Sequence, residues 1–235
     1  MIQKLYSYKG VDIYRTVSVG LNSNMYCLFG ENKCAILVDP CVSEEIREFI
    51  KNNNVDEIRI LLTHEHYDHI SGVNYFRTEF DNVTVICSSA CAINIELPEK
   101  NLALYWEVLL SGMDEENRKA GAQIMDLDYS CKADLGYNCE YDFVWNEIKI
   151  KMVCAPGHSP GGSIIYLDDA FVFSGDNLVN GNGVICRWPG GSKKDYLQIT
   201  KPILCDIGRD TIVFPGHGEP GYIAELIRYT EMFKK

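Results

Sequence analysis

The sequence predicts an α/β (α+β) protein in which two β-sheets are covered on their outer faces by helices. Short β-branched or aromatic runs, typical of strands, gather in two parts of the chain, and helical segments follow each group. The chain has 235 residues with 46% hydrophobic content, which is enough for a full core. No repeat, linker or shift in composition divides it, so we expect residues 1–235 to form a single domain.

The first group of strands lies in the N-terminal third of the chain. VDIYRTVSV, NMYCLFG and KCAILVD are strand-like runs broken by turn residues. In the following SEEIREFIKNN, Ile46, Phe49 and Ile50 share one helical face, and Ser43 is placed as the N-cap. IRILLT and VTVIC are further strands, and the segment 69–80 between them is expected to be helical.

The second group of strands follows a long helical stretch. Residues 88–120 are predicted to be mostly helical and residues 121–146 to be irregular. Strands return in EIKIKMVCA, SIIYLDD and AFVFSGD, and the last two join through a hairpin turn at Asp168-Asp169. TIVFPG is the last expected strand. The segment SKKDYLQITKPIL, capped by Ser192, and the C-terminal YIAELIRYTEMF are predicted helices.

The charge and composition of the chain restrict the classes of molecule that it can bind and the compartment in which we expect it. With 33 acidic and 22 basic residues, the net charge of −11 opposes binding to nucleic acid or to an anionic membrane. The first residues lack the apolar segment of a signal peptide, and no apolar run approaches the roughly 20 residues of a membrane span, so we expect a cytoplasmic protein. Most of the ten cysteines lie in apolar runs without a CxxC pair, which predicts reduced thiols that pack as small hydrophobes.

The segment LLTHEHYDHISG, residues 61–72, carries His64, His66, Asp68 and His69 within six positions. In an extended loop, side chains two residues apart point to the same side, so His64 and His66 can converge on one ion. In a helix they would diverge by about 200°. The helical HExxH motif would need a histidine at position 68. The segment is therefore predicted to be a loop that leaves a strand, with Asp68 and His69 turned towards a second ion.

The other histidines repeat one local context. His158 in CAPGHSPGG and His217 in VFPGHGEP each follow a strand and a Pro-Gly pair, and Asp176 ends the strand AFVFSGD. Glycine lets the backbone pass close to a bound ion. Because all five histidines of the chain fall at such strand ends, we interpret them as one site.

Counting donors predicts two metal sites. Three imidazoles, the number expected of a catalytic zinc with an open position, form the first set: His64, His66 and His158. A mixed set is left for a second metal: Asp68, His69 and His217. Asp176 can bridge the two, which suits ions about 3.5–4 Å apart. Nitrogen and oxygen donors together suit two divalent ions, with zinc expected first and iron or manganese as alternatives.

At this point the residues resemble a known family, the metallo-β-lactamase superfamily. NMYCL and AILVDPC look like its opening hairpins, SGDNL resembles the strand that carries its bridging aspartate, and CRWPGGSKKDYLQ is similar to the following loop and helix of glyoxalase II-like members. The resemblance implies a four-layer αββα sandwich with the metals in a groove at one edge of the two sheets. It also implies the metal ligands: His64, His66, Asp68, His69, His158, Asp176 and His217.

The resemblance also narrows the branch of the family. Asp176 resembles the bridging residue of glyoxalase II and lactonase-type members, whereas true β-lactamases lack an acidic residue there, which argues against antibiotic hydrolysis. Glyoxalase II has an additional C-terminal helical region that grips glutathione, but here only about 18 residues follow His217. Glutathione specificity is therefore not expected.

Three further residues are candidates at the site. The resemblance implies that Asp39 orients a ligating histidine, with a turn or cap role as the alternative. Arg187 is a candidate for an anionic substrate group or for a surface salt bridge. Tyr67 shapes the pocket or only packs.

The leading functional hypothesis is hydrolysis of a small thioester, ester or lactone. A metal-bound hydroxide would attack the carbonyl carbon, with His64, His66 and Asp68 as the catalytic residues. Three alternatives stay open: a persulfide dioxygenase with one iron, a phosphodiesterase of the same fold, and a binding module without turnover. The expected partner is a small-molecule substrate. The apolar run LALYWEVLLSGM is interpreted as core, pocket wall or the face of a homodimer.

Overall fold

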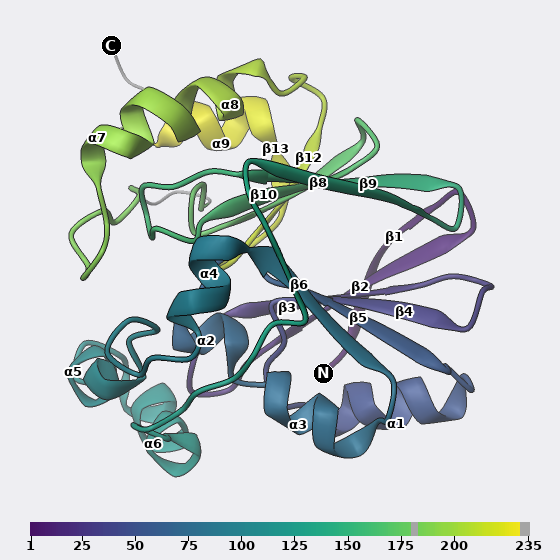
Figure 1. Ribbon diagram of the computed structural model, residues 1–235, viewed down its shortest axis with the longest axis horizontal. Coiled ribbons are helices and arrows are strands. Elements are labelled where there is room, and N and C mark those ends of the chain that lie inside the picture. The colour runs from purple at the N-terminus through teal and green to yellow at the C-terminus, as the bar shows by residue number, and fades with distance from the viewer. Residues whose placement is uncertain (180–182, 231–235) are drawn as a thin grey trace.

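Two β-sheets pack face to face in the computed structural model, which describes residues 1–179 and 183–230 (Figure 1). The first sheet contains seven strands in chain order: β1 (Gln3–Tyr8), β2 (Val11–Val17), β3 (Asn24–Phe29), β4 (Cys34–Val38), β5 (Glu57–Leu61), β6 (Val83–Ser88) and β7 (Leu135–Tyr137). The strands β1 to β4 pair antiparallel, whereas β4 to β7 pair parallel.

The second sheet contains six strands in the order β13-β12-β11-β10-β9-β8. Its members are β8 (Glu140–Trp145), β9 (Ile148–Cys154), β10 (Ser163–Leu167), β11 (Phe171–Gly175), β12 (Ile212–Pro215) and β13 (Gly221–Tyr222). Only the pair β11 and β12 is parallel. The ends of β11 and β12 therefore meet at one edge, and Gly216 N donates to Gly175 O there at 2.9 Å.

A central core fills the space between the sheets. Tyr26 from the first sheet packs its ring 5.3 Å from that of Phe173 and 5.2 Å from that of Phe214, both in the second sheet. All three side chains are buried. Ring pairs at this separation and tilt are favourable beyond the burial of their surface.

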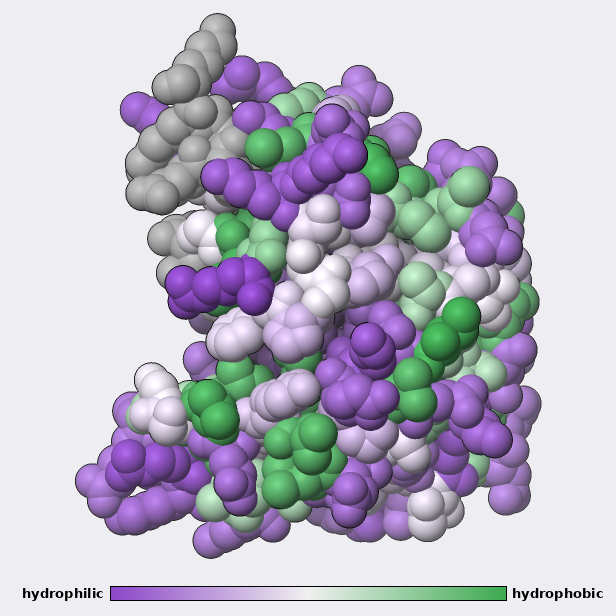
Figure 2. All heavy atoms as spheres, turned by 60° about the vertical axis from the view of Figure 1, so that its left-hand side comes forward, coloured by the Kyte–Doolittle hydropathy of each residue, from purple (hydrophilic) through white to green (hydrophobic). Residues whose placement is uncertain are grey.

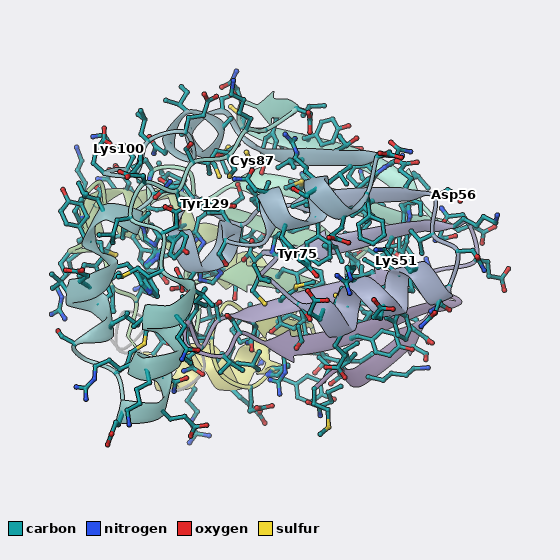
Figure 3. All side chains as sticks on the ribbon, turned by 90° about the horizontal axis from the view of Figure 1, so that it is seen from below. Lys51, Asp56, Tyr75, Cys87, Lys100 and Tyr129 are labelled. Carbon is teal, nitrogen blue, oxygen red and sulfur yellow. The ribbon has the colours of Figure 1, made fainter. Side chains whose placement is uncertain are left out.

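Helices cover both outer faces and complete the αββα sandwich. On the first sheet lie α1 (Glu44–Asn52) and α3 (Val73–Glu79), which bury Ile46, Ile50 and Phe76 against it (Figure 3). On the second sheet lie α7 (Lys193–Asp195), the π-helical turn η2 (Tyr196–Thr200), α8 (Lys201–Asp206) and α9 (Ile223–Tyr229). The predicted arrangement of two sheets between helices is confirmed.

A group of shorter helices lies beside one end of the sandwich (Figure 1, left). It contains α2 (Tyr67–Ile70), α4 (Ser89–Asn94), the 3-10 turn η1 (Ala103–Tyr105), α5 (Trp106–Leu110) and α6 (Glu115–Ile124). The prediction of a mostly helical stretch after residue 88 is confirmed. Among residues 1–179 and 183–230, no helix has the length and apolar character needed to cross a membrane.

The predicted caps and thiols are confirmed. The hydroxyl of Ser43 accepts a hydrogen bond from Ile46 N, and that of Ser192 accepts one from Asp195 N. Asp168 takes a positive φ of 46° in the hairpin between β10 and β11. All ten cysteines are free, and six of them are buried. The predicted C-terminal helix begins at Ile223 and ends at Tyr229, and its last expected residues, 231–233, lie outside the described residues.

One prediction about local structure is wrong. Residues 121–146 are not irregular, because β7 and β8 lie within them. The turn that joins β8 to β9 places Asn146 and Glu147 at φ of 48° and 60°. A hairpin turn with two positive φ values usually has the sequence Asn-Gly, and here glutamate stands in place of glycine. The segment 69–80 is mostly helical, as predicted, but it is divided between the end of α2 and α3. It breaks at Gly72, where a side chain would lie 2.6 Å from the Cys41 carbonyl.

We expect Phe173→Ala to lower the free energy of unfolding by about 3–5 kcal/mol, because it removes a ring packed between the two sheets. Urea denaturation of both proteins measures the difference. The matched control is Val144→Ala in the edge strand β8, where the side chain is 70% exposed and the change should stay within about 0.5 kcal/mol. Equal effects of the two substitutions would contradict a core between the sheets.

Candidate metal centre

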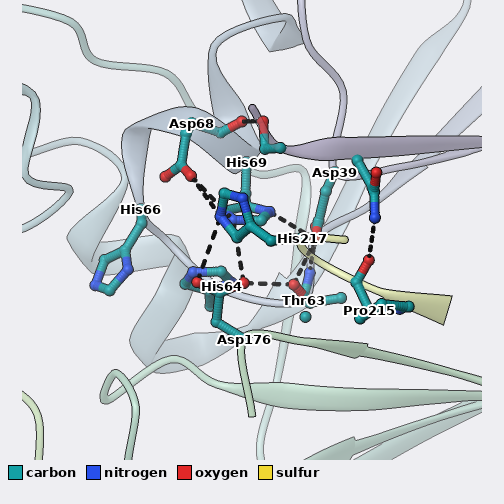
Figure 4. A network of polar contacts seen from close by, with 12 residues as sticks. Asp39, Thr63, His64, His66, Asp68, His69, Asp176, Pro215 and His217 are labelled. Atoms are coloured by element: carbon teal, nitrogen blue, oxygen red, sulfur yellow. Dashed lines mark hydrogen bonds and ion pairs between the residues drawn. The ribbon is translucent and has the colours of Figure 1, made fainter. Parts of the chain in front are cut away.

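The candidate ligands stand where strands end at one edge of the sandwich (Figure 4). His64 and His66 lie in the extended loop between β5 and α2, as predicted, and Thr63 O of that loop accepts from Ser163 N of the second sheet at 2.7 Å. His158 follows β9, and Asp176 follows β11 directly. The two sheets therefore bring segments that are far apart in the sequence to one place.

The structure brings all seven predicted residues together. In the first set, the ring nitrogens of His64, His66 and His158 lie within 4.8 Å of one another, and His66 Nδ1 is 3.0 Å from His158 Nε2. In the second set, Asp68 Oδ2 is 3.2 Å from His69 Nε2 and 3.1 Å from His217 Nε2.

Asp176 lies between the two sets. Its Oδ2 is 3.6 Å from His158 Nε2 in the first set and 3.6 Å from His217 Nε2 in the second. Its Oδ1 is 3.5 Å from His69 Nε2. One carboxylate therefore contacts donors of both sets, which is the placement that a bridging ligand requires.

The far sides of two rings are held by backbone carbonyls. His158 Nδ1 donates to Ile185 O, and His217 Nδ1 donates to Asn22 O, both at 2.7 Å. Because a carbonyl oxygen only accepts, each Nδ1 carries a hydrogen. In the neutral ring the lone pair then lies on Nε2, which faces the other ligands.

Asp39 holds the far sides of two more rings. Its Oδ2 accepts from the Thr63 hydroxyl at 2.5 Å and from His69 Nδ1 at 3.2 Å. The Thr63 oxygen, whose hydrogen is given to Asp39, accepts in turn from His64 Nδ1 at 3.0 Å. Asp39 therefore orients one histidine of each set, which is the contact that the resemblance implied. Such partners fix the tautomer of a ligating histidine and its ring orientation.

The inner atoms of the site match a cationic group. Among the buried side-chain atoms of the described residues that have no hydrogen-bond partner, three lie in this site: His64 Nε2, His69 Nε2 and Asp176 Oδ1. An unpartnered buried polar atom is costly, and these converge on one another. Imidazole nitrogens and carboxylate oxygens are zinc ligands, so the residues present fit metal ions.

Burial and neighbouring charges set the ionisation of these groups. Burial, reinforced by nearby imidazoles, lowers the pKa of His64 well below its usual value and that of His66 to about 3. Both rings are therefore neutral at pH 7, the form that binds a metal. Burial opposes ionisation of Asp68, but His69 and His217 still hold the pKa of this carboxyl well below its usual value.

In the second set, the carboxylates stabilise the protonated form of the histidines. Burial lowers the pKa of His217, but Asp176 and Asp68 outweigh it and raise this pKa to about 9. The same carboxylates, with Asp39, raise the pKa of His69 against the effect of burial. Positive charge is therefore favoured next to Asp68 and Asp176, and bound cations would supply it.

Residues 19–217 match the model of the metallo-beta-lactamase superfamily. The chain belongs to this superfamily. The "Probable metallo-hydrolase YqgX" of Bacillus subtilis is 26% identical over 211 residues, which cover 87% of this chain and 90% of that protein. A hydroxyacylglutathione hydrolase of Buchnera aphidicola (subsp. Schizaphis graminum) is 40% identical over 73 residues only, 31% of this chain and 29% of that protein.

Solved structures show the same fold. The BLEG-1 B3 metallo-beta-lactamase superposes with a TM-score of 0.76 at 24% identity, covering 95% of this chain and 100% of that chain. TTHA1623, solved in a di-iron-bound form, superposes with a TM-score of 0.68 at 24% identity, covering 92% and 98%. The chain is thus a metallo-hydrolase with the αββα fold, as the sequence predicted.

The sequence analysis did not single out Glu65, which lies between His64 and His66 in the sequence. Its side chain is fully buried and points away from the metal centre to the loop that carries His158. Its carboxylate accepts from Ser159 Oγ at 2.9 Å, from Gly161 N at 3.1 Å and from Asn94 Nδ2 at 2.8 Å. The alternation of an extended loop places Glu65 opposite its neighbours, but only the fold supplies these partners.

A cavity of about 370 Å³ opens beside the ligands. Five of the seven ligand residues line it: His66, Asp68, His158, Asp176 and His217. Part of the apolar run LALYWEVLLSGM, including Trp106, also lines the cavity. This run therefore forms part of a pocket wall, which is one of the three roles considered for it. Larger hollows of about 670 and 540 Å³ contain none of the seven ligand residues.

The remaining candidates are less central. Tyr67 packs edge-on against Trp106, with ring centroids 5.4 Å apart, and donates to Ile124 O at 2.9 Å, so it supports the cavity wall from behind. Arg187 is exposed and is not among the described residues that line the cavity.

We expect Thr63→Val to weaken metal binding by about 10–100-fold, because His64 Nδ1 loses its acceptor and the ring loses its fixed tautomer. Thr63→Ser keeps the hydroxyl and should bind metal like the wild type. Competition with a chromogenic chelator measures both affinities. Wild-type affinity in Thr63→Val would refute the role of the Asp39–Thr63–His64 chain.

We expect Glu65→Ala to lower the free energy of unfolding of the metal-free protein by about 2–4 kcal/mol, since it leaves the buried Ser159 hydroxyl and Gly161 N–H without an acceptor. Glu99→Ala, which alters an exposed glutamate in the same half of the molecule, should change it by less than about 0.5 kcal/mol. Denaturation by urea compares the three proteins. A loss below 1 kcal/mol would show that Glu65 does not join the two loops.

Proposed function

We propose that the protein is a dinuclear metal-dependent hydrolase of small thioesters, esters or lactones. The observation that carries the proposal is the position of Asp176, which contacts donors of both ligand sets. A carboxylate that two cations share has to reach both ligand sets, and Asp176 does. We propose zinc for both positions, with iron or manganese as alternatives, because the donors combine imidazole nitrogen with carboxylate oxygen.

The chain's own residues bind and orient the reacting groups. Divalent cations, when bound, make a water molecule acidic enough to attack at neutral pH and polarise the substrate carbonyl. The first set of three histidines binds one cation and faces the cavity through His66 and His158. The second set would hold the other cation, with Asp176 in contact with donors of both sets. Hydrolysis then joins the water oxygen to the carbonyl carbon and breaks its bond to the leaving sulfur or oxygen.

Asp68 is the residue that we propose to move the proton. Its carboxylate lines the cavity, and its Oδ2 lies in the second ligand set beside His217. The proton released by the attacking water passes to a carboxylate oxygen of Asp68 and from there to the leaving group. In the metal-free protein, His69 and His217 hold the pKa of Asp68 below its usual value, and a bound cation would favour the same ionised form.

The other activities of the fold fit these residues less well. A persulfide dioxygenase uses one iron and fewer ligands, whereas here Asp68, His69 and His217 form a second set. A phosphodiesterase binds an anionic substrate, whereas the described cavity wall contains no lysine or arginine. A binding module without turnover would not need the full set of ligands.

We expect His64→Ala and Asp176→Ala to reduce bound metal below two ions per chain and to lower kcat by more than about 100-fold. Loss of an outer partner of a ligand already costs about 10–100-fold, and these substitutions remove a ligand itself. Elemental analysis and thioesterase assays provide the two readouts. Asp169→Ala in an exposed turn serves as the control and should keep both values.

The same assays distinguish the alternatives. One iron per chain with consumption of oxygen would replace the hydrolase with a dioxygenase. Cleavage of phosphodiesters, but not of thioesters, esters or lactones, would indicate a phosphodiesterase. Full metal content and turnover in both ligand variants would reject the assignment of the site.

A further inference from the structure

The walls of the cavity beside the metal centre are apolar. On one side they consist of Leu21 and residues of the helical group: Leu102, Trp106, Leu109 and Met113. On the other side they consist of residues after β11: Val179, Ile185 and Trp188. The polar groups of the described wall belong to the candidate ligands and to the indole rings of Trp106 and Trp188, and the Trp106 N–H is buried without a hydrogen-bond partner. Figure 2 shows the surface hollowed on the side of the short helices, with apolar residues in green beside the hollow.

From this wall we infer the substrate class: the acyl group that enters the cavity is uncharged and aliphatic or aromatic. The inference rests on the proposed hydrolase function and deepens it. A neutral hydrocarbon group gains free energy by leaving water for such a wall. A carboxylate on the same group would lose its hydration without a cationic partner.

The charges around the cavity support the same conclusion. No lysine or arginine lines its described wall. Arg187 is adjacent in sequence to Trp188 but is exposed. A second carboxylate at the far end of a substrate would therefore meet no lysine or arginine of the described wall.

The apolar wall is joined rigidly to the metal centre. Ile185 lines the cavity with its side chain, and its carbonyl accepts from His158 Nδ1 at 2.7 Å. Across the cavity, Trp106 is 97% buried and packs against Tyr67, the residue between His66 and Asp68. An acyl group between these walls thus lies next to the ligands, with its carbonyl within reach of them.

A pair of substrates matched in shape tests the inference. The 4-methylpentanoyl and succinyl thioesters of N-acetylcysteamine differ in that two methyl groups replace two carboxylate oxygens. We expect the metal-loaded wild-type protein to hydrolyse the neutral thioester with a kcat/KM at least about tenfold higher. An equal or higher kcat/KM for the succinyl thioester would overturn the substrate class while leaving the hydrolase function intact.

A substitution in the wall provides the matched variant. Leu109→Lys places an amine at a half-buried position of the wall and should reduce the preference for the neutral thioester at least about fivefold. Val108→Lys adds the same charge one residue away, where the side chain is 70% exposed and outside the wall, and should keep the wild-type preference. The same change in both variants, or in neither, would contradict an acyl site at this wall.

Binding without turnover separates the two proposals. Two of the three tryptophans line the cavity, so ligand binding should change the intrinsic fluorescence. We expect 4-methylpentanamide to bind the metal-loaded protein at least about tenfold more tightly than succinamate. If neither thioester is hydrolysed but this preference holds, the hydrolase proposal fails and the acyl site stands. Equal binding of the two amides overturns the acyl site whatever the turnover.

Discussion

A single buried carboxylate, that of Asp39, connects the fold to the metal centre. It follows β4, takes a left-handed φ of 51° and is only 3% exposed. One oxygen accepts from Thr63 N, and the other accepts from the Thr63 hydroxyl and from His69 Nδ1. Through these three bonds it fixes the start of the histidine loop and one imidazole of each ligand set. Charge-assisted bonds of this kind are strong in a site shielded from water, so the loop geometry depends on this residue more than on helix or strand propensity.

The packing of the two sheets brings together segments that are far apart in the sequence, which Asp39 alone could not do. Packing of Tyr26 against Phe173 and Phe214 sets the position of one sheet on the other. At one edge, Ser163 N donates to Thr63 O between the sheets, and Gly216 N donates to Gly175 O. Three buried atoms that converge there have no hydrogen-bond partner: His64 Nε2, His69 Nε2 and Asp176 Oδ1. Metal binding therefore contributes to folding free energy as well as to chemistry, because it relieves atoms whose burial the core otherwise has to offset.

The sequence was sufficient to predict the seven candidate ligands, which the structure brings together, because each is a histidine or aspartate close to the end of a strand. It also predicted most strands and the caps at Ser43 and Ser192, which depend on neighbouring residues. Contacts across the chain were not predictable in this way: Glu65 meets Ser159 across 94 positions. The edge strand β8 escaped prediction because its exposed positions carry Glu140 and Asp142 and its turn lacks glycine. The break at Gly72 arises from close approach to Cys41, which only the folded packing creates.

The central claim is that two cations share this site, one on each ligand set, with Asp176 between them. Anomalous X-ray diffraction from crystals of the zinc-loaded protein, collected on both sides of the zinc edge, tests it most directly. The account predicts two zinc peaks, one within coordination distance of His64, His66 and His158 and the other of Asp68, His69 and His217, with Asp176 contacting both. A single peak, or two peaks of which one lies away from these side chains, would contradict it.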